Sequence, residues 1–298
     1  MNVELRHLRA LAAIGDEGTI TGAAAALHIS QPALSRTLDQ LESRTGTRLV
    51  ERTTRRLALT EPGRRLWEHA HRILNQLDQA LAEATAGPRP LRIGFAWAAL
   101  GRHTVPLLRG WREEHPGVPV RVHRRDDPEA ALRRGELDAA FLRTPPPGDP
   151  GLTALALYTE RRFAAVPEGG PLARRSALRL ADLAGEQVVL CATAATSGSG
   201  LWPEGGRPHT FEVANVDEWL TVIATGEAVG VTAEGTEHSH PHPGVRYLPL
   251  LDADPVTVHL VTPHTPTHPA ARAFRAHARR HTADSRGPFR EGPEHEIS

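Results

Sequence analysis

A stretch near the N-terminus carries side chains of the types that recognise nucleic acid. Gln31, Ser35 and Arg36 fall on the polar side of a helix that begins at Ser30. Glutamine can bind adenine, and arginine can bind guanine, through paired hydrogen bonds in the major groove of DNA. The hydroxyls of Thr21 and Ser30, together with the helix N-termini, can hold phosphates and set the position of a protein on the duplex. These residue types predict a helix that reads a DNA sequence.

Positive charge follows directly after this helix. Residues 36–65 contain eight arginines and four acidic residues, a net charge of +4, whereas the whole chain of 298 residues has no lysine, 35 arginines and 35 acidic residues. The tip of a predicted hairpin is expected to lie along the DNA backbone or in the minor groove, and consists of Arg52, Thr53, Thr54, Arg55 and Arg56. Each phosphate that these residues neutralise would steepen the plot of log affinity against log salt concentration by about 0.9. The alternative is an arginine-rich surface that contacts only water. The order of helix, tight turn, capped helix and basic hairpin favours DNA binding instead.

Apolar spacing and capping residues predict the helices that position these groups. A first helix carries leucines at helical spacing, and Gly18 ends it. Thr21 is expected to cap a second, alanine-rich helix, whose small side chains allow the next helix to approach closely. Ser30 is expected to cap that third helix, with Pro32 in its first turn and Gly46 at its end.

A basic hairpin and a long helix are expected next. Two short β-like runs over 49–51 and 57–59 form the hairpin, and Thr60 caps a helix that continues to about Ala86. Apolar residues recur in this helix at spacings of 4, 3, 4, 3 and 4, namely Leu66, Ala70, Ile73, Leu77, Ala80 and Ala84. So narrow a stripe favours a coiled-coil seam between two copies over packing on the helix's own domain.

The pattern changes after the break at Gly87–Pro90. Strands then alternate with helices, which predicts an α/β domain whose parallel strands are joined by helical crossovers. Strands are expected at 91–96, 118–123 and 137–142, near Leu155, Phe163 and Val188, and at 229–232 and 256–261; helices are expected up to Glu114 and at 128–134, 216–225 and 269–281. The polar tail from Thr282, rich in glycine and proline, is predicted to be disordered.

The remaining reactive residues do not suggest catalysis. His238, His240 and His242 are of a type that binds zinc, nickel or copper, but the neighbouring prolines indicate an exposed loop rather than a metal site. Cys191, the single cysteine, ends a predicted strand and is expected to be buried and structural. No nucleophile elbow, acid–base set or glycine-rich phosphate loop is found, so neither an enzyme nor a cofactor is predicted. The sequence shows no secretion signal or membrane span, which predicts a cytoplasmic protein.

From Leu5 to Gly63 the sequence closely resembles the DNA-binding domain of LysR-type transcriptional regulators. The matching motifs are SQPALSR at 30–36, LE at 41–42, Gly46, LVER at 49–52 and LTEPG at 59–63. Weaker marks of the family continue at 135–138, 171–173, 180–184 and 225–231.

This resemblance implies a winged helix-turn-helix in residues 1–60, a linker and dimerisation helix in 61–88, an effector-binding domain in 89–282 and a tail in 283–298. It also implies two α/β lobes arranged as in periplasmic binding proteins. Lobe one would comprise 91–160 and 263–282, lobe two 161–262, and crossing strands near 159–161 and 260–262 would form the hinge. The partners implied are operator DNA, a small-molecule effector, RNA polymerase and further copies of the chain in a homodimer or homotetramer.

The expected effector cleft departs from the family pattern. Many members carry a serine or threonine after the first strand of lobe one, where this chain has Trp97 and Ala98. This apolar loop points either to a larger, more hydrophobic effector or to an anion held by other groups. The candidate residues are Trp97, Ala98, Arg102, Arg125, Thr144 and Thr193. A solute-binding protein and an enzyme are the alternatives for a two-lobed domain, and the N-terminal helix-turn-helix argues against both.

Overall fold

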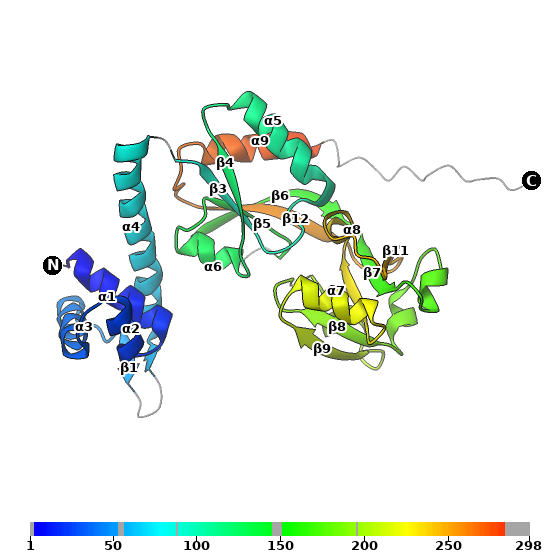
Figure 1. The fold of residues 1–298 in the computed structure, drawn as a ribbon, viewed down its shortest axis with the longest axis horizontal. Coiled ribbons are helices and arrows are strands. Elements are labelled where there is room, and N and C mark those ends of the chain that lie inside the picture. Colours follow the sequence, from blue (N-terminus) through cyan, green and yellow to red (C-terminus); the bar gives the residue numbers. More distant parts are fainter. Residues whose placement is uncertain (1–2, 53–56, 88, 145–150, 195, 284–298) are drawn as a thin grey trace, which may run out of the picture. The chain divides into compact units, whose positions relative to one another are not determined.

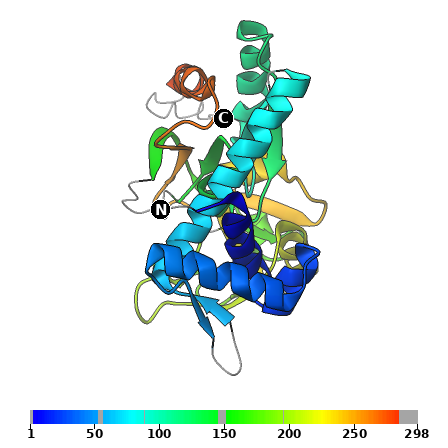
Figure 2. The same ribbon diagram turned by 90° about the vertical axis from the view of Figure 1, so that its left-hand side faces the viewer.

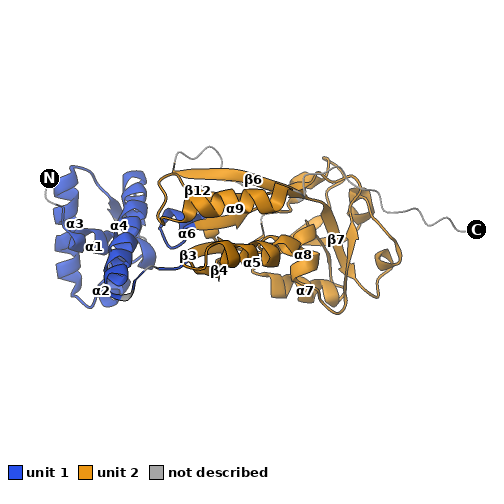
Figure 3. Cartoon of the chain, turned by 90° about the horizontal axis from the view of Figure 1, so that it is seen from above, with its two compact units in different colours: residues 1–90, 129–138 blue, residues 91–128, 139–298 orange. Residues whose placement is uncertain are grey.

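The computed structural model describes residues 3–52, 57–87, 89–144, 151–194 and 196–283 (Figure 1). The chain divides into two compact units, one formed by residues 1–90 with 129–138 and the other by residues 91–128 with 139–298 (Figure 3). No helix in the described part of the chain is both long and apolar enough to cross a bilayer.

The N-terminal unit begins with the three predicted helices, α1 (Leu5–Glu17), α2 (Ile20–Ala26) and α3 (Gln31–Thr45). Gly18 ends α1 and Gly46 ends α3, each in the left-handed conformation that glycine adopts without strain. The predicted cap of α2 was wrong, because Thr19 and not Thr21 has the extended backbone of a cap, and its hydroxyl accepts from the Gly22 amide at 3.0 Å. The helix therefore starts at Ile20, and Thr21 lies within its first turn.

The wing and the long helix follow as predicted. Strands β1 (Val50–Arg52) and β2 (Leu57–Leu59) pair antiparallel, and α4 (Glu61–Ala86) begins at the Thr60 cap. In Figure 2, α1 lies against α4, near the end of α4 where the two strands also lie. A single core of leucine, isoleucine, alanine and valine from α1, α2, α3 and the wing holds this unit together. Residues 129–138, which include all of the short α6 (Pro128–Arg133) except Pro128, also belong to the N-terminal unit.

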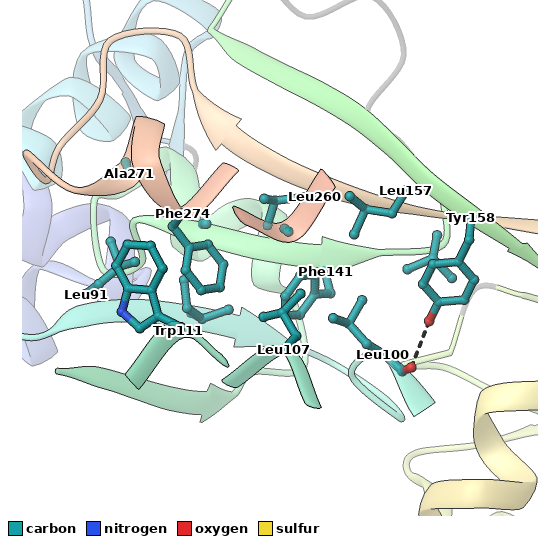
Figure 4. Close-up of a cluster of buried hydrophobic side chains, with 14 residues drawn as sticks. Leu91, Leu100, Leu107, Trp111, Phe141, Leu157, Tyr158, Leu260, Ala271 and Phe274 are labelled. Atoms are coloured by element: carbon teal, nitrogen blue, oxygen red, sulfur yellow. Dashed lines mark hydrogen bonds between the residues drawn. The ribbon is translucent and has the colours of Figure 1, made fainter. Parts of the chain in front are cut away.

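The first sheet of the C-terminal unit has the order β4-β3-β5-β12-β6. Its strands are β3 (Leu91–Phe95), β4 (Val120–Arg124), β5 (Ala139–Leu142), β6 (Leu152–Glu160) and β12 (Val256–Pro263). The first three are parallel, as predicted, and β12 pairs antiparallel with both β5 and β6. Helices α5 (Thr104–Glu114) and α9 (Ala271–Ala283) cover it, and Figure 4 shows Trp111 and Phe274 meeting within their shared core.

The second sheet has the order β11-β7-β10-β8-β9. Its strands are β7 (Arg162–Pro167), β8 (Gln187–Cys191), β9 (His209–Val213), β10 (Val229–Ala233) and β11 (Val245–Pro249), and its helices are α7 (Val216–Ala224) and α8 (Glu234–Ser239). The described residues of this unit also include the short 3-10 helices η1 (Gly101–His103), η2 (Leu172–Arg174), η3 (Leu180–Leu183) and η4 (Ser199–Leu201). The two sheets are the cores of the two expected lobes.

Several predicted boundaries in this unit differ from the structure. The chain first crosses between the sheets at Glu160–Arg162, as expected, but the return crossing near 260–262 was wrong. Residues 256–263 form one apolar strand that is already paired inside the first sheet, so the return lies between β11 and β12, and residues 256–262 belong to lobe one by strand pairing. Strands β9 and β11 were not predicted, and residues 284–298 lie outside the described part of the chain.

Candidate DNA-binding surface and interlobe site

The α3 helix has one buried and one polar face. The Ser30 hydroxyl accepts a hydrogen bond from the Ala33 amide at 3.4 Å and fixes the start of the helix. Leu34, Leu38 and Leu41 are fully buried against the other helices. The opposite face carries Gln31, Pro32 and Arg36, which are exposed, and Ser35, which is half-buried. A helix anchored in this way holds its polar side chains outward without a contribution from them to the core.

Local hydrogen bonds orient the polar side chains of this face. The Gln31 side-chain amide donates to the hydroxyl of Thr21 at 3.1 Å, which joins α2 to α3. The Arg36 guanidinium donates to the carbonyl of Pro32 at 3.2 Å, one helical turn earlier. Both side chains are exposed, and these weak contacts can be exchanged for contacts to a base at little cost.

The arginines of residues 36–65 differ in their partners. Arg44 is held inside the unit by Glu4 at 3.2 Å and by the ring of His7, and this contact is the main reason that the pKa of Glu4 lies below its usual value. Arg64 and Arg65 both lie within 3.5 Å of Glu61 at the start of α4. The wing residues Thr53, Thr54, Arg55 and Arg56, and the side chain of Arg52, lie outside the described part of the structure.

The apolar stripe of α4 is buried at one end and exposed at the other. Leu66 packs against the N-terminal core and Ala70 is fully buried. Farther along, Ile73 is 45% exposed, Leu77 is half-buried, and Ala80 and Ala84 are exposed. The first turns of the stripe therefore pack within their own domain, which was the alternative to a coiled-coil seam. The later turns expose apolar side chains to solvent.

The opposite side of α4 binds the segment that follows α6. The Asn75 and Gln79 side chains donate to the carbonyls of Arg134 and Gly135 at 2.6 and 3.3 Å. These two positions lie on the far side of the helix from Ile73 and Ala80, because residues two apart in an α-helix point in widely different directions. The open stripe therefore coexists with two hydrogen-bonded side chains on the opposite face.

Trp97 connects the two lobes. Its side chain extends from the loop after β3 in lobe one into a cluster of lobe-two residues and is only 6% exposed. The indole nitrogen donates to the Thr236 hydroxyl of α8 at 2.5 Å, and the ring lies 5.6 Å from Trp219 and 5.4 Å from His240. Burial against these groups lowers the pKa of His240.

A buried ion pair fixes the backbone of the same loop. The Arg143 guanidinium binds both carboxylate oxygens of Glu160 at 2.8 and 2.9 Å, and both side chains are less than 7% exposed. Arg143 also donates to the carbonyls of Trp97 and Ala99 at 3.1 and 3.2 Å. The Tyr158 hydroxyl donates to the carbonyl of Leu100 at 2.8 Å (Figure 4), and burial raises the pKa of this phenol.

This support holds an unusual backbone conformation. Ala98 and Ala99 have φ values of 50° and 40°, in the left-handed region that alanine rarely adopts. Gly101 in η1, two residues after Ala99, also has a positive φ, and a Cβ atom there would lie 2.8 Å from the Cα of Gly235 in α8. A Cβ atom at Gly235 would in turn lie 2.5 and 2.6 Å from the side chains of Arg143 and Glu160, so the lobes meet closely at two glycines.

Comparison with known proteins identifies the family. Residues 5–64 match the bacterial regulatory helix-turn-helix proteins of the lysR family, and residues 85–283 match the LysR substrate binding domain. The chain belongs to the LysR family. It is a transcriptional regulator with an N-terminal winged helix-turn-helix and a two-lobed effector-binding domain, as predicted, and the family is one of regulators rather than enzymes.

Relatives of known sequence or structure agree with this assignment. The chain is 32% identical over 297 residues to the regulator YnfL of Escherichia coli, a match covering 93% of this chain and 98% of YnfL. It is 40% identical over 186 residues, 59% of each chain, to a probable hydrogen peroxide-inducible genes activator of Mycobacterium avium. The structure of CbnR in complex with its target DNA shares the fold, with a TM-score of 0.57, 24% identity and coverage of 94% of this chain and all of CbnR.

Within this LysR-family regulator, the predicted effector residues are not all in one place. Trp97 and Ala98 lie together in the interlobe cluster, and Thr193 contacts Cys191, which is a member of it. Arg102 is 58% exposed and faces Glu234 at 3.5 Å. The remaining two, half-buried Arg125 and exposed Thr144, are not members of that cluster.

Sequence reasoning missed the residues that support the loop. Arg143, Tyr158 and Glu160 follow or end predicted strands, but their meeting depends on the pairing of β5 and β6 with β12, which the sequence pattern does not specify. One signal in the sequence could have revealed them, namely a charged residue at or directly after the end of each of two largely apolar strands. The cavity beside Tyr158 and Glu160 has a volume of only about 10 Å³, so this part of the lobe interface is closed.

The prediction for Cys191 was confirmed, and the prediction for the histidine segment was only partly correct. Cys191 is buried at the end of β8, as predicted. The expected loop around His238 was wrong in part, because residues 234–239 form α8, which ends before Pro241. In this segment His240 lies against Trp97, while His238 points to the carbonyl of Glu234 at 3.5 Å.

Proposed function

We propose that this regulator reads its operator through α3 in the major groove and through the wing on the phosphate backbone. The proposed contact residues are Thr21, Ser30, Gln31, Pro32, Ser35 and Arg36, with Arg52, Thr53, Thr54, Arg55 and Arg56 of the wing. The exposed polar face of α3 opposite three buried leucines carries this proposal. CbnR, which shares the fold, forms a complex with its target DNA.

The effector is proposed to bind between the two lobes, next to the Trp97 loop. Trp97, Ala98, Arg102, Arg125, Thr144 and Thr193 are the candidate contacts. The support is the interlobe position of Trp97, whose indole occupies space that a ligand could take if the lobes opened. Because an effector can shift an equilibrium only by its differential affinity for two states, it must favour a conformation in which this indole moves.

The regulator is further proposed to act in the cytoplasm as a homodimer or homotetramer that contacts RNA polymerase. The domain limits proposed from the sequence remain 1–60, 61–88 and 89–282. The open apolar stripe of α4 supports self-association, since a long apolar seam in water gains free energy by meeting a second copy.

The DNA-reading proposal is tested by a gel-shift assay on the intergenic DNA beside the gene of this protein. Arg36→Ala is expected to weaken specific binding by about 10- to 100-fold, because loss of one bidentate contact to a base costs about 1–3 kcal/mol. Gln31→Ala is expected to lose affinity similarly and to relax the preference at one base pair. A variant that loses a phosphate contact is instead expected to reduce the slope of log affinity against log salt concentration by about 0.9.

Arg246→Ala is the matched control, because Arg246 is an exposed arginine on β11 in lobe two. It removes the same charge from the chain and is expected to bind like the unmodified protein. Equal binding by the Arg36, Gln31 and Arg246 variants would overturn the assignment of α3 as the reading helix.

A further inference from the structure

A cluster of metal-binding side chains lies on lobe one, apart from the interlobe site. Glu114 is the last residue of α5, and His277 and His281 stand one turn apart on α9. One ligand atom from each of the three residues lies within 4.8 Å of the others. Two histidines four residues apart on a helix present their rings on the same side, the spacing used by helical metal sites.

The hydrogen bonds of His277 set its protonation pattern. This ring is fully buried, and its Nε2 lies 2.9 Å from the carbonyl of Leu107. A carbonyl only accepts, so Nε2 is the donor, and the neutral ring then has its lone pair on Nδ1. That atom faces the Oε2 atom of Glu114 at 3.1 Å. A carboxylate oxygen also only accepts, so a cation must lie between the two atoms, either a proton or a metal ion.

The second histidine is arranged in the same way. Nδ1 of His281 lies 3.3 Å from the carbonyl of His277, which leaves the lone pair of the neutral ring on Nε2. Nε2 occupies the space beside Gly110, where a Cβ atom would lie only 2.5 Å away. A ligating histidine commonly donates its other ring nitrogen to a backbone carbonyl, and both rings satisfy that condition.

The distances suit a small divalent ion. Donors about 2.0–2.1 Å from a tetrahedral zinc ion lie about 3.3 Å from each other, close to the observed separation of Nδ1 of His277 and Oε2 of Glu114. His281, which is partly exposed, has a ring nitrogen within 4.8 Å of the other two ligand atoms and completes a set of two histidines and one carboxylate. The Arg280 guanidinium binds the same Oε2 atom at 2.8 Å, but its side chain is 58% exposed and can turn into solvent.

We propose that Glu114, His277 and His281 bind a first-row transition-metal ion, with zinc as the best match, and leave one position open to water. The ion joins the last residue of α5 to the second half of α9, two helices whose side chains contribute to the core of lobe one. Because binding to the folded state alone stabilises it, metal is expected to raise the melting temperature of the effector-binding domain.

The test is a titration of the untagged full-length protein with Co²⁺, followed by displacement with Zn²⁺. We expect one equivalent of cobalt with the visible absorption of a tetrahedral site, bleached by zinc, and a rise in Tm with either ion. Glu114→Ala and His281→Ala are each expected to weaken binding by at least about 100-fold. Neither residue is buried, so the folding of both variants can be checked by circular dichroism without metal.

The double variant His238→Ala/His242→Ala is the matched control, because it removes two histidines from the other histidine-rich segment. It is expected to bind cobalt like the unmodified protein. The proposal is overturned if no stoichiometric binding occurs, which would assign the cation between His277 and Glu114 as a proton. It is equally overturned if only the control variant loses the metal.

Discussion

At the scale of single residues, the contact between Arg143 and Glu160 does more than neutralise two charges. Arg143 uses its remaining donor on the carbonyls of Trp97 and Ala99, so the pair holds the left-handed turn that directs Trp97 between the lobes. Two adjacent alanines with positive φ cost free energy that other interactions must offset. The ion pair is therefore a positioning element for the interlobe site.

Removing one partner of this pair should be costly. We expect Arg143→Met to lower the free energy of unfolding of the effector-binding domain by about 3–5 kcal/mol, because Glu160 is left as a buried, unpaired charge. Urea unfolding followed by tryptophan fluorescence measures the change, since Trp97 and Trp219 lie in the affected cluster.

Two variants separate this effect from a general loss of charge. The double variant Arg143→Met/Glu160→Leu leaves no unpaired charge and should recover part of the stability. Arg175→Met removes an exposed ion pair with Asp182 and should change stability by less than about 1 kcal/mol. If all three variants unfolded at the same urea concentration, the buried pair would have no special role.

At the scale of elements, glycines decide how closely helices and strands approach. Gly63, in the first turn of α4, lies directly against the wing, and a Cβ atom there would be 1.9 Å from the carbonyl oxygen of Leu49. That carbonyl also accepts from the Thr60 amide, so it cannot move without disturbing the start of α4. The glycine therefore couples the wing to the long helix.

Gly63→Ala is expected to destabilise the N-terminal unit by about 1–3 kcal/mol, the usual cost of forcing an extra carbon into a well-packed site. Thermal unfolding and the affinity for operator DNA would both report it, because the wing must shift. Gly117→Ala is the control, since a Cβ atom at Gly117 meets nothing within 4 Å. A Gly63 variant as stable as the control would refute the coupling.

The elements of the N-terminal unit were predictable because their signals are local. Ser30, Thr60 and Gly46 act within one helical turn of the residues they cap, so the sequence specified α3 and α4 closely. The error at Thr21 arose because Thr19 precedes the same helix and is an equally good capping residue. Only the backbone conformation distinguishes the two.

At the scale of the whole molecule, strand pairing limited what could be predicted. The alternation after Leu91 correctly indicated an α/β domain, and the resemblance supplied its two lobes. The return crossing was misplaced because Val256–Pro263 reads as a buried strand whichever sheet it joins. The residues that support the Trp97 loop were missed for the same reason, since Arg143 follows β5, Glu160 ends β6, and the two meet only in the folded sheet.

The proposed self-association through α4 would allow the protein to bind two operator half-sites at once. Ile73 in the outer part of the stripe is 45% exposed, and Leu81, beside the stripe one turn after Leu77, is 59% exposed. Asn75 and Gln79 on the other side of the helix already form hydrogen bonds. An apolar seam of this kind is stabilised when a second copy covers it, and a charge placed in it must be dehydrated without a partner.

Ile73→Glu, alone or with Leu81→Glu, is therefore expected to shift the protein from dimer or tetramer toward smaller species in sedimentation velocity. Operator affinity should fall by more than about tenfold, because two linked reading helices bind far more tightly than one. Asp78→Lys changes an exposed residue of the same helix away from the stripe and should leave both properties unchanged. If the Ile73 and Asp78 variants sedimented alike, subunits would have to associate through another surface, and the stripe of α4 would need a different explanation.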